Sequence, residues 1–234
     1  MIRALICDID GTLIDSVPAH IEAWKRAFAR FGKEVSDEEI RHQIGKGNDD
    51  MLPVFFSREK LDRFRLDLEK YRGELFKREY LPSLKPFPRV RDLFECIKHD
   101  GIKIALGSTA KGEDIAIYKE MARIEDLVTC AVCSEEVEHS KPHRDICAVA
   151  LDKLGLPAEQ VLAIGDTAYD VESASKMSVC SIGFLCGGGT KDELERAGCV
   201  AVYSHPADLL EHYDGSPLSR PVVSNIYAAD EKVS

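Results

Sequence analysis

Positions 8–16 read Asp8-Ile9-Asp10-Gly11-Thr12-Leu13-Ile14-Asp15-Ser16 and directly follow the short apolar run Arg3-Ala4-Leu5-Ile6-Cys7. A buried parallel strand delivers its last residues to the carboxyl edge of its sheet, where open α/β folds bind ligands. Side chains at i and i+2 of an extended chain point to the same side, so we expect Asp8 and Asp10 to be neighbours in a crevice. The stretch therefore predicts an active site at the end of the first strand.

The two carboxylates cannot share this crevice without compensation. Like charges about 4 Å apart repel by about 4 kcal/mol at an effective dielectric constant near 20. The pair needs a bound cation, a shared proton or divergence of the second side chain. In the alternative interpretation, Asp10-Gly11 is a plain hairpin turn and Asp8 is a solvated strand end. We favour function because further matching residues follow in a consistent order.

Bulk properties exclude several classes of protein. The chain has 234 residues, enough for one large or two small domains, and a net charge of −10. That charge argues against a surface for nucleic acid or anionic membranes, which require clustered Lys and Arg. No apolar run approaches the roughly 18 residues of a membrane span, and no secretory pattern opens the chain. We expect a cytoplasmic protein of undetermined oligomeric state, and an anionic substrate would need a local cation.

The eight cysteines are irregularly spaced, and several fall in apolar strand candidates. Reduced thiols behave there as small core residues. The pair in Cys130-Ala131-Val132-Cys133 resembles a metal or redox motif, but positions three apart on a strand face opposite sides. The pattern therefore predicts packing rather than chemistry.

Residues 21 to about 80 have helical periodicity. Ser36-Asp37-Glu38-Glu39 is typical of a capping box. The apolar positions form two stripes, Ile21, Trp24, Phe28 and Phe31, then Leu61, Phe64, Leu68, Tyr71 and Leu75. This periodicity predicts a small all-helical domain over residues 16–82.

Beyond Pro82, short apolar strands alternate with helices in the manner of βαβ units. The predicted strands are Ile102–Gly107, Val128–Cys133, Val161–Gly165, Val179–Phe184 and Val200–Tyr203, and the predicted helices begin near Arg89, Gly112, Pro142, Ala168 and Thr190. We predict an α/β fold, a doubly wound parallel, Rossmann-like sheet. Its domain comprises residues 1–15 and 83–213, and residues 214–234 are predicted to form a surface tail.

Three more polar groups fall at predicted strand ends or helix starts. Ser108-Thr109 offers two hydroxyls to an anionic oxygen, although both residue types also cap helices. Lys141-Pro142 places a cation at a helix start, which favours phosphate, although a surface lysine there would be unremarkable. Asp166 and Asp170 follow the fourth predicted strand and are alternatively an N-cap and an ordinary helical residue. With Asp8 and Asp10 they make a hard oxygen set that favours Mg²⁺.

In this order and spacing, the residues resemble the haloacid dehalogenase-like (HAD) hydrolase superfamily over roughly residues 1–213. The resemblance implies a Rossmann-like core, and the insert at 16–82 looks like the helical cap of the subgroup containing phosphoglycolate phosphatase and β-phosphoglucomutase. It implies Asp8 as nucleophile, Asp10 as acid and base, and Mg²⁺ held by Asp8, the Asp10 carbonyl, Asp166 and Asp170. Ser108, Thr109 and Lys141 would stabilise the phosphoryl group. Relatives often carry Asn or Ser at the position of Thr109.

The second aspartate favours phosphoryl transfer, because the dehalogenases of this superfamily lack it. Two further residues could bind substrate. Lys46 lies in the turn Ile44-Gly45-Lys46-Gly47-Asn48-Asp49, which could reach over the crevice or simply connect helices. His20 lies near the hinge, where related mutases place a histidine, or is an ordinary helix residue near Trp24.

The resemblance thus predicts a Mg²⁺-dependent phosphatase that hydrolyses a small-molecule phosphate ester through an aspartyl-phosphate. A sugar-phosphate mutase is the first alternative, disfavoured because Asn48-Asp49-Asp50 replaces the arginine that holds a second phosphate in mutases. A non-catalytic binding protein of the same fold is the second. Cys186-Gly187-Gly188-Gly189-Thr190 lacks the GK[ST] ending of a P-loop and is predicted to be a flexible loop after its strand.

Overall fold

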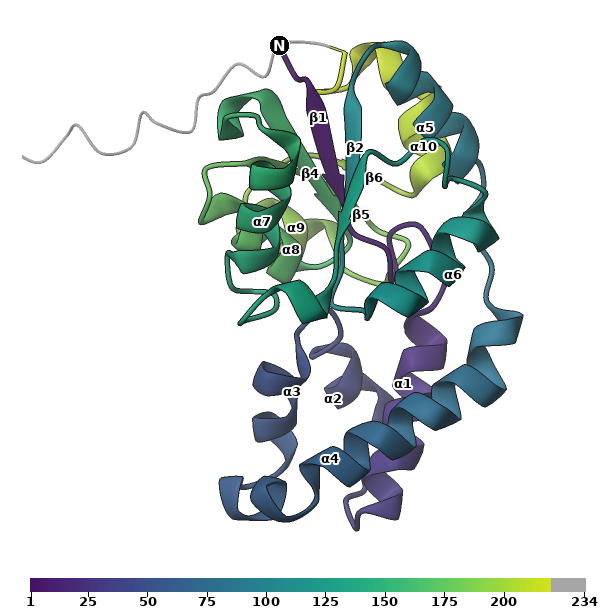
Figure 1. Ribbon diagram of the computed structural model, residues 1–234, viewed down its shortest axis with the longest axis vertical. Coiled ribbons are helices and arrows are strands. Elements are labelled where there is room, and N and C mark those ends of the chain that lie inside the picture. Colours follow the sequence, from purple (N-terminus) through teal and green to yellow (C-terminus); the bar gives the residue numbers. More distant parts are fainter. Residues whose placement is uncertain (220–234) are drawn as a thin grey trace, which may run out of the picture.

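The computed structural model describes residues 1–219, which form a parallel sheet flanked by helices, with a second group of helices beyond one end of the sheet (Figure 1). The strands are β1 (Ala4–Cys7), β2 (Lys103–Gly107), β3 (Cys130–Val132), β4 (Val161–Gly165), β5 (Cys180–Phe184) and β6 (Cys199–Tyr203). The α-helices are α1 (Val17–Arg30), α2 (Asp37–Arg41), α3 (Asn48–Phe55), α4 (Arg58–Leu75), α5 (Val90–His99), α6 (Gly112–Ala122), α7 (Asp145–Leu154), α8 (Ala168–Ser175), α9 (Lys191–Ala197) and α10 (Pro206–Glu211). A π-helical turn, Phe76–Tyr80, extends α4, and 3₁₀ turns occur at Leu81–Ser83, Ser134–Glu136, Ala158–Gln160 and Tyr213–Gly215.

The strand order is β3-β2-β1-β4-β5-β6, and every neighbouring pair is parallel. The chain leaves β1 in one direction along the sheet and returns to its other side at β4, so the topological switch point lies at β1. Cys7 is in register with Leu106 of β2 and Ile164 of β4. The residues that follow these three strands therefore meet at one edge, and the predicted doubly wound α/β fold is confirmed.

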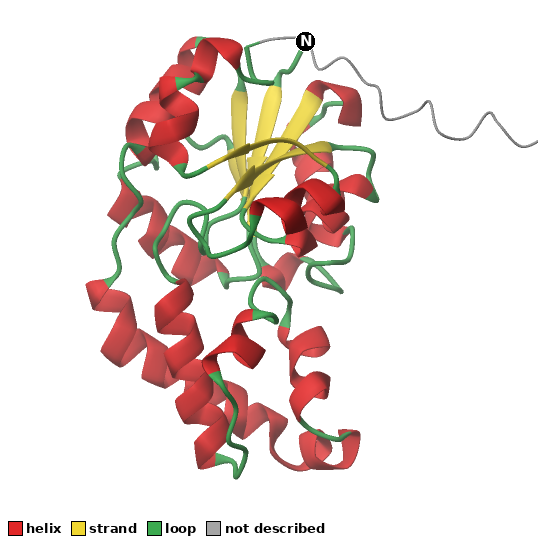
Figure 2. Ribbon diagram, turned by 180° about the vertical axis from the view of Figure 1, so that it is seen from behind, coloured by secondary structure: helices red, strands yellow, loops and turns green. Residues whose placement is uncertain are grey.

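Alternating side chains bury both faces of the sheet, and Figure 2 shows helices on either side of the strands. In β1, Leu5 and Cys7 join the cluster that includes α5 and α10, whereas Ala4 and Ile6 join the cluster that includes α7 and α8. This period of two follows from the pleat. A sheet buried on both faces explains why its strands are continuously apolar in sequence.

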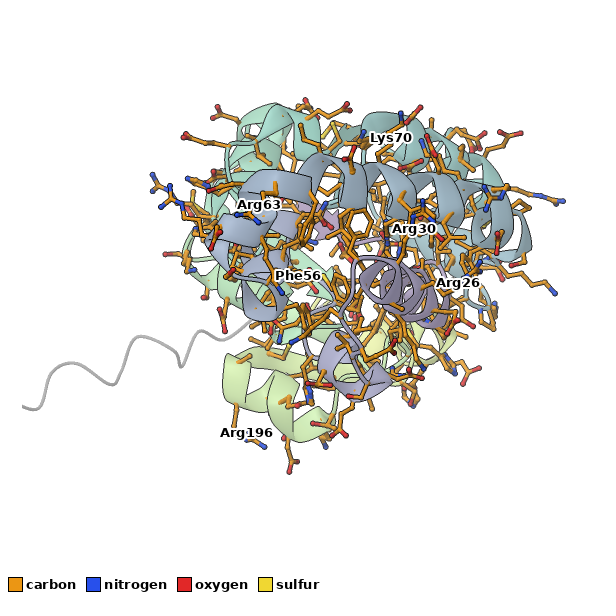
Figure 3. All side chains as sticks on the ribbon, turned by 90° about the horizontal axis from the view of Figure 1, so that it is seen from below. Arg26, Arg30, Phe56, Arg63, Lys70 and Arg196 are labelled. Atoms are coloured by element: carbon orange, nitrogen blue, oxygen red, sulfur yellow. The ribbon has the colours of Figure 1, made fainter. Side chains whose placement is uncertain are left out.

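Helices α1 to α4 have a hydrophobic cluster of their own. The Phe28 ring packs against those of Phe55 and Phe56, with centroids 4.8 and 5.3 Å apart. Figure 3 views this group from its far end, with Phe56 among the helices and Arg63 and Lys70 at the outer surface of α4. The predicted capping box forms at Ser36, whose backbone N–H donates to the carboxylate of Glu39 at 2.9 Å.

Two segments differ from the sequence prediction. The helix predicted from Pro142 begins at Asp145, because residues 142–144 turn first and an acidic residue favours the first helical turn. Residues 214–219 are not a surface tail: Ser216 is fully buried, and Leu218 is 4% exposed within the cluster on the α5 and α10 face. The rest of the predicted tail, residues 220–234, lies outside the described residues.

In residues 1–219, no helix combines the length and hydropathy needed to cross a bilayer.

Leu218→Ala should lower the free energy of unfolding by about 2–5 kcal/mol, because it leaves a cavity in a packed cluster. Leu66 is 80% exposed, so Leu66→Ala is the control and should change stability by less than about 0.5 kcal/mol. Urea unfolding followed by circular dichroism measures both. Equally small effects would show that the segment around Leu218 does not pack as described.

Candidate active site

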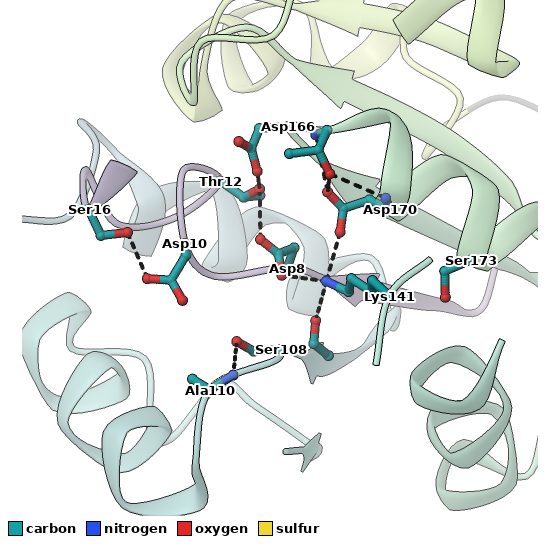
Figure 4. A network of polar contacts seen from close by, with 12 residues as sticks. Asp8, Asp10, Thr12, Ser16, Ser108, Ala110, Lys141, Asp166, Asp170 and Ser173 are labelled. Atoms are coloured by element: carbon teal, nitrogen blue, oxygen red, sulfur yellow. Dashed lines mark hydrogen bonds and ion pairs between the residues drawn. The ribbon is translucent and has the colours of Figure 1, made fainter. Parts of the chain in front are cut away.

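Asp8 is the first residue after β1, and its backbone N–H donates to the Ile164 carbonyl at 2.9 Å. Its side chain contacts the ammonium group of Lys141 (Figure 4). The same ammonium donates to the Gly107 carbonyl at 2.8 Å, and Lys141 as a whole is 5% exposed. A buried cation from the loop before α7 is thus held against the ends of β1 and β2.

Two further carboxylates complete an acidic cluster. Asp166 follows β4, and Asp170 lies in the first turn of α8. Carboxylate oxygens of Asp8, Asp166 and Asp170 all lie within 4.8 Å of one another. Lys141 Nζ also forms an ion pair with Asp170, 2.7 Å from its Oδ1. One buried ammonium therefore faces three buried carboxylates.

The pKa values of Asp8 and Asp166 are raised, which is consistent with an excess of buried negative charge. Burial raises the pKa of Asp8 to about 7, and the charge of Asp170 adds to the rise, although Lys141 opposes both. Burial, then the charges of Asp170 and Asp8, raise the pKa of Asp166 well above its usual value. An additional cation would relieve this repulsion. Clustered carboxylate oxygens are the donors that Mg²⁺ takes in proteins, so the residues present fit such an ion.

Thr12 is a site residue that the sequence reasoning did not single out. It is fully buried, and its hydroxyl donates to Asp166 Oδ1 at 2.8 Å while lying 3.4 Å from Asp8 Oδ2. It thereby links the loop after β1 to the carboxylate after β4. Its place next to Gly11 in the opening motif was the available signal.

Asp10 turns away from Asp8. Its Oδ1 accepts from the Ser16 hydroxyl at 2.7 Å and lies 2.8 Å from His20 Nε2. The expectation that Asp8 and Asp10 share one side is wrong, because β1 ends at Cys7 and the alternation of an extended strand does not reach Asp10. The side chains of Asp8 and Asp10 therefore diverge, which is one of the three ways in which their charges could be accommodated.

His20 is held in place by groups from the end of α4. Its ring stacks on Phe76 at 4.3 Å with an interplanar angle of 3°, and its Nδ1 contacts a guanidinium nitrogen of Arg72. A guanidinium can only donate, so Nδ1 is the acceptor and Nε2 carries the proton that is donated to Asp10. Burial would raise the pKa of Asp10, but its interaction with the His20 Nε2–H, the hydrogen bond from Ser16 and the charge of Arg72 lower it to about 2.

Arg72 and Tyr118 also belong to this environment and were missed. The Arg72 guanidinium lies between the rings of Trp24 and Phe76, 4.8 and 4.9 Å from their centroids, and its enclosed Nε has no partner. Burial, then the charge of Asp10, raise the pKa of Tyr118. Arg72 follows Leu68 by four residues on the apolar face of α4, and a charge at such a position was the signal.

The hydroxyls after β2 lie at the same edge of the sheet. Ser108 is 1% exposed, and its Oγ accepts from the backbone N–H of Ala110 at 3.1 Å (Figure 4). Thr109 is half-buried, and within residues 1–219 its hydroxyl has no hydrogen-bond partner. The structure therefore brings Ser108 to the end of β2 beside Lys141, which is bonded to the preceding carbonyl.

The turn between α2 and α3 contacts the loops around the acidic cluster. The Gly47 N–H donates to the Lys141 carbonyl at 3.2 Å, and the Tyr169 hydroxyl donates to the His42 carbonyl at 2.7 Å. Lys46 Nζ lies 4.9 Å from the centre of the Tyr169 ring and donates to Gln43. The turn thus reaches the sheet edge, with Lys46 directed at Tyr169 rather than at the carboxylates.

Lys141→Met should destabilise the metal-free protein by about 3–5 kcal/mol, the cost of leaving a buried charge uncompensated. Lys153→Met is the matched control, since Lys153 pairs with Glu136 where the side chains are 33 and 37% exposed. Such surface pairs contribute about 0–1 kcal/mol. If chemical denaturation gave equal effects, the Lys141 ammonium would not be compensating the acidic cluster.

The metal-free protein should lose stability as the pH rises from about 4 to about 7. Because the pKa of Asp8 is raised from 3.8 to about 7, the folded state binds more protons than the unfolded state in this window, so stability falls with pH. Asp10, with a pKa lowered to about 2, acts only below this window. Unfolding free energies measured in a chelator should vary less with pH in Asp8→Asn; an unchanged slope would contradict the assignment.

Comparison with known proteins agrees with this geometry. A sequence profile of the family described as haloacid dehalogenase-like hydrolase matches residues 5–184. A phosphorylated carbohydrates phosphatase of Thermotoga maritima is 26% identical over 209 residues, covering 89% of this chain and 96% of the relative. A phosphoglycolate phosphatase of Yersinia pestis is 27% identical over 214 residues, covering 89% and 92%.

Solved structures show the same fold. A hydrolase from Pseudomonas syringae superposes with a TM-score of 0.81 at 28% identity, covering 91% of this chain and 98% of that one. A β-phosphoglucomutase from Clostridium difficile gives 0.76 at 20% identity, covering 93% and 97%, a likeness of fold alone. Since the profile spans most of the chain, this protein belongs to the haloacid dehalogenase-like hydrolase family.

Proposed function

We propose that this protein is a Mg²⁺-dependent phosphatase that hydrolyses a small phosphorylated metabolite by transferring its phosphoryl group to Asp8. The observation that carries the proposal is the position of the Asp8 carboxylate, buried after β1 against the Lys141 ammonium and within 4.8 Å of carboxylate oxygens of Asp166 and Asp170. Membership of the family and the phosphatase names of the relatives support it.

Asp8 is the proposed nucleophile. One of its carboxylate oxygens attacks phosphorus, the bond from phosphorus to the leaving oxygen breaks, and an aspartyl-phosphate forms. Lys141, with the hydroxyls of Ser108 and Thr109 at the end of β2, would donate to the phosphoryl oxygens as their charge develops. Ser108 and Thr109 directly follow β2, and Lys141 reaches the same edge of the sheet from the loop before α7.

Asp10 is the proposed acid and base. It would donate a proton to the leaving oxygen and then accept one from the water that hydrolyses the aspartyl-phosphate, releasing inorganic phosphate and regenerating Asp8. In the ligand-free structure its pKa of about 2 corresponds to the proton-accepting form. A phosphoryl dianion beside it would raise that pKa towards the donating form.

Mg²⁺, when bound by Asp8, Asp166, Asp170 and the backbone carbonyl of Asp10, would supply the positive charge that the carboxylates and a phosphate dianion together require. The acidic cluster offers these ligands, and the repulsion within it disfavours the metal-free state. Without the ion, Asp8 would repel its substrate.

We propose that residues 16–82 act as a cap that selects the leaving group. Helices α1 to α4 meet the sheet edge through the turn containing Lys46 and through His20, which lies 2.8 Å from Asp10. In this proposal both residues would contact the part of the substrate beyond the phosphate. Phosphorylated carbohydrates and phosphoglycolate, the substrates in the relatives' names, are of suitable size.

Hydrolysis is preferred to mutase chemistry because Asp49 and Asp50 follow the cap turn. Asp49 pairs with Arg65, and Asp50 Oδ2 lies 3.3 Å from His143 Nε2. A bisphosphate would bring more negative charge to this surface.

Incubation with a hexose 1-phosphate separates the two activities. A mutase yields the isomerised sugar phosphate without net release of inorganic phosphate, whereas a phosphatase releases inorganic phosphate.

Asp8→Asn should abolish Mg²⁺-dependent release of phosphate from a generic aryl phosphate, and Asp10→Asn should slow it by at least about 100-fold, the typical loss of acid–base help. Asp15→Asn, in the same loop, is the control and should retain activity. Steady-state assays with circular dichroism of each variant make the measurement. Wild-type rates in Asp8→Asn would remove Asp8 from the mechanism.

A further inference from the structure

Two glycines of the loop after β5 enclose Asp166, although the sequence predicted only a flexible connection there. A Cβ on Gly187 would lie 1.8 Å from Asp166 Oδ2, and a Cβ on Gly189 would lie 2.5 Å from the Asp166 backbone oxygen. Gly11, from the opening motif, approaches from another side, with a Cβ position 2.4 Å from the same Oδ2. Non-bonded heavy atoms prefer separations of about 3.5–4.0 Å, so no side chain fits at any of the three.

We propose that Gly187 is a positioning residue for the metal site: it lacks a side chain so that the Asp166 carboxylate can face Asp8. The inference rests on the proposed function, because it concerns a ligand of the proposed ion. In the observed orientation, Asp166 accepts from Thr12 at 2.8 Å and its oxygen lies within 4.8 Å of those of Asp8 and Asp170. A methyl group at position 187 would occupy the space of that carboxylate.

Of the three glycines, Gly187 is the one at which a substitution would act most directly on the Asp166 side chain. Gly11 has a φ of +78°, and its Cβ position also meets Val17 at 2.8 Å, so any substitution strains the backbone as well. Gly189 opposes a backbone atom, which cannot rotate away. The three closest atoms to a Cβ on Gly187 all belong to the Asp166 side chain. Only there does a substitution act directly on the proposed ligand.

The loop is fixed on both sides of Gly187, so the carboxylate rather than the backbone should yield. The Cys186 thiol donates to the Gly11 carbonyl at 3.2 Å, and the Gly188 N–H donates to the Leu185 carbonyl at 3.0 Å. Thr190 then caps α9, its hydroxyl accepting from the Glu193 N–H at 3.3 Å. Displacement of Asp166 would break its bond from Thr12.

Because of electrostatic repulsion, this displacement should affect the metal-free fold and metal binding differently. Moving one carboxylate away from Asp8 and Asp170 relieves repulsion in the metal-free protein, which offsets part of the steric cost. The same movement removes a ligand from the proposed Mg²⁺ site. A change at Gly187 should therefore weaken metal binding far more than it weakens the metal-free fold.

The test compares wild type, Gly187→Ala and the control Gly215→Ala, whose Cβ would meet nothing within 4 Å. Mg²⁺ affinity is measured by calorimetry, and the unfolding temperature is measured with and without Mg²⁺. We expect Gly187→Ala to weaken Mg²⁺ binding by about 10- to 100-fold, as lost support of a ligand typically does. Its Mg²⁺-induced rise in unfolding temperature should shrink, and Gly215→Ala should match wild type.

Asp166→Asn supplies the coupling measurement. If Gly187 acts through Asp166, adding Gly187→Ala to Asp166→Asn should cause little further loss of affinity, whereas independent effects would add. Additive losses would overturn the proposal, as would a Gly187→Ala protein that unfolds earlier but keeps its full Mg²⁺-induced rise. Absence of Mg²⁺ binding by wild type would instead refute the proposed function before any variant is compared.

Folding failure of Gly187→Ala would also be informative. Asp166→Gly removes every side-chain atom that the new methyl would strike, including the Cβ of Asp166, which lies 2.7 Å from the Cβ position of residue 187. The double variant Gly187→Ala with Asp166→Gly should then fold and show the circular dichroism of wild type. A double variant that remained unfolded would show that position 187 clashes with something other than Asp166 and would overturn the proposal.

Discussion

The excess of buried negative charge at the carboxyl edge of the sheet is the constraint on which the site depends. Asp8, Asp166 and Asp170 face a single ammonium, that of Lys141, and burial amplifies their repulsion. The fold tolerates this because the carboxylates stand on strand ends and a helix start that the core holds in place. Ionisable groups whose pKa values are strongly shifted cluster at functional sites, which supports the proposed role of this cluster.

Several other parts of the molecule bring their residues to this edge of the sheet. The switch point of the sheet brings the ends of β1, β2 and β4 together, and the chain leaves β1 directly into helices α1 to α4, the proposed cap. Leu13 and Asp15 pair with the returning chain through the Phe87 N–H and the Lys85 carbonyl, so the two connections between cap and sheet run side by side. The cap then supplies His20, which orients Asp10 away from Asp8. The two motif aspartates thereby acquire opposite environments, with one pKa raised and the other lowered.

The sequence was sufficient for features that depend on local pattern and strand order. Apolar runs ending in polar residues predicted that Asp8 and the pair Asp166 and Asp170 lie at one edge, because parallel strands deliver their ends there, whereas Lys141 was predicted from a helix start. It was insufficient wherever distant segments dock. The Arg72 contact with His20 requires the end of α4 to lie against α1, and the contact of Gly187 with Asp166 requires the exact path of a glycine-rich loop. The predicted orientation of Asp10 was wrong for a different reason: strand alternation was applied to Asp10, three residues past the end of β1 at Cys7.

The most direct test of this account locates the ion. Crystals grown in Mn²⁺ in place of Mg²⁺ would reveal the metal by anomalous diffraction. We expect one strong peak between the carboxylates of Asp8 and Asp166, with metal–oxygen distances near the ~2.0–2.2 Å typical of small divalent ions. A metal bound elsewhere, or crystals without a peak at saturating Mn²⁺, would contradict the claim that a divalent cation balances the buried charge.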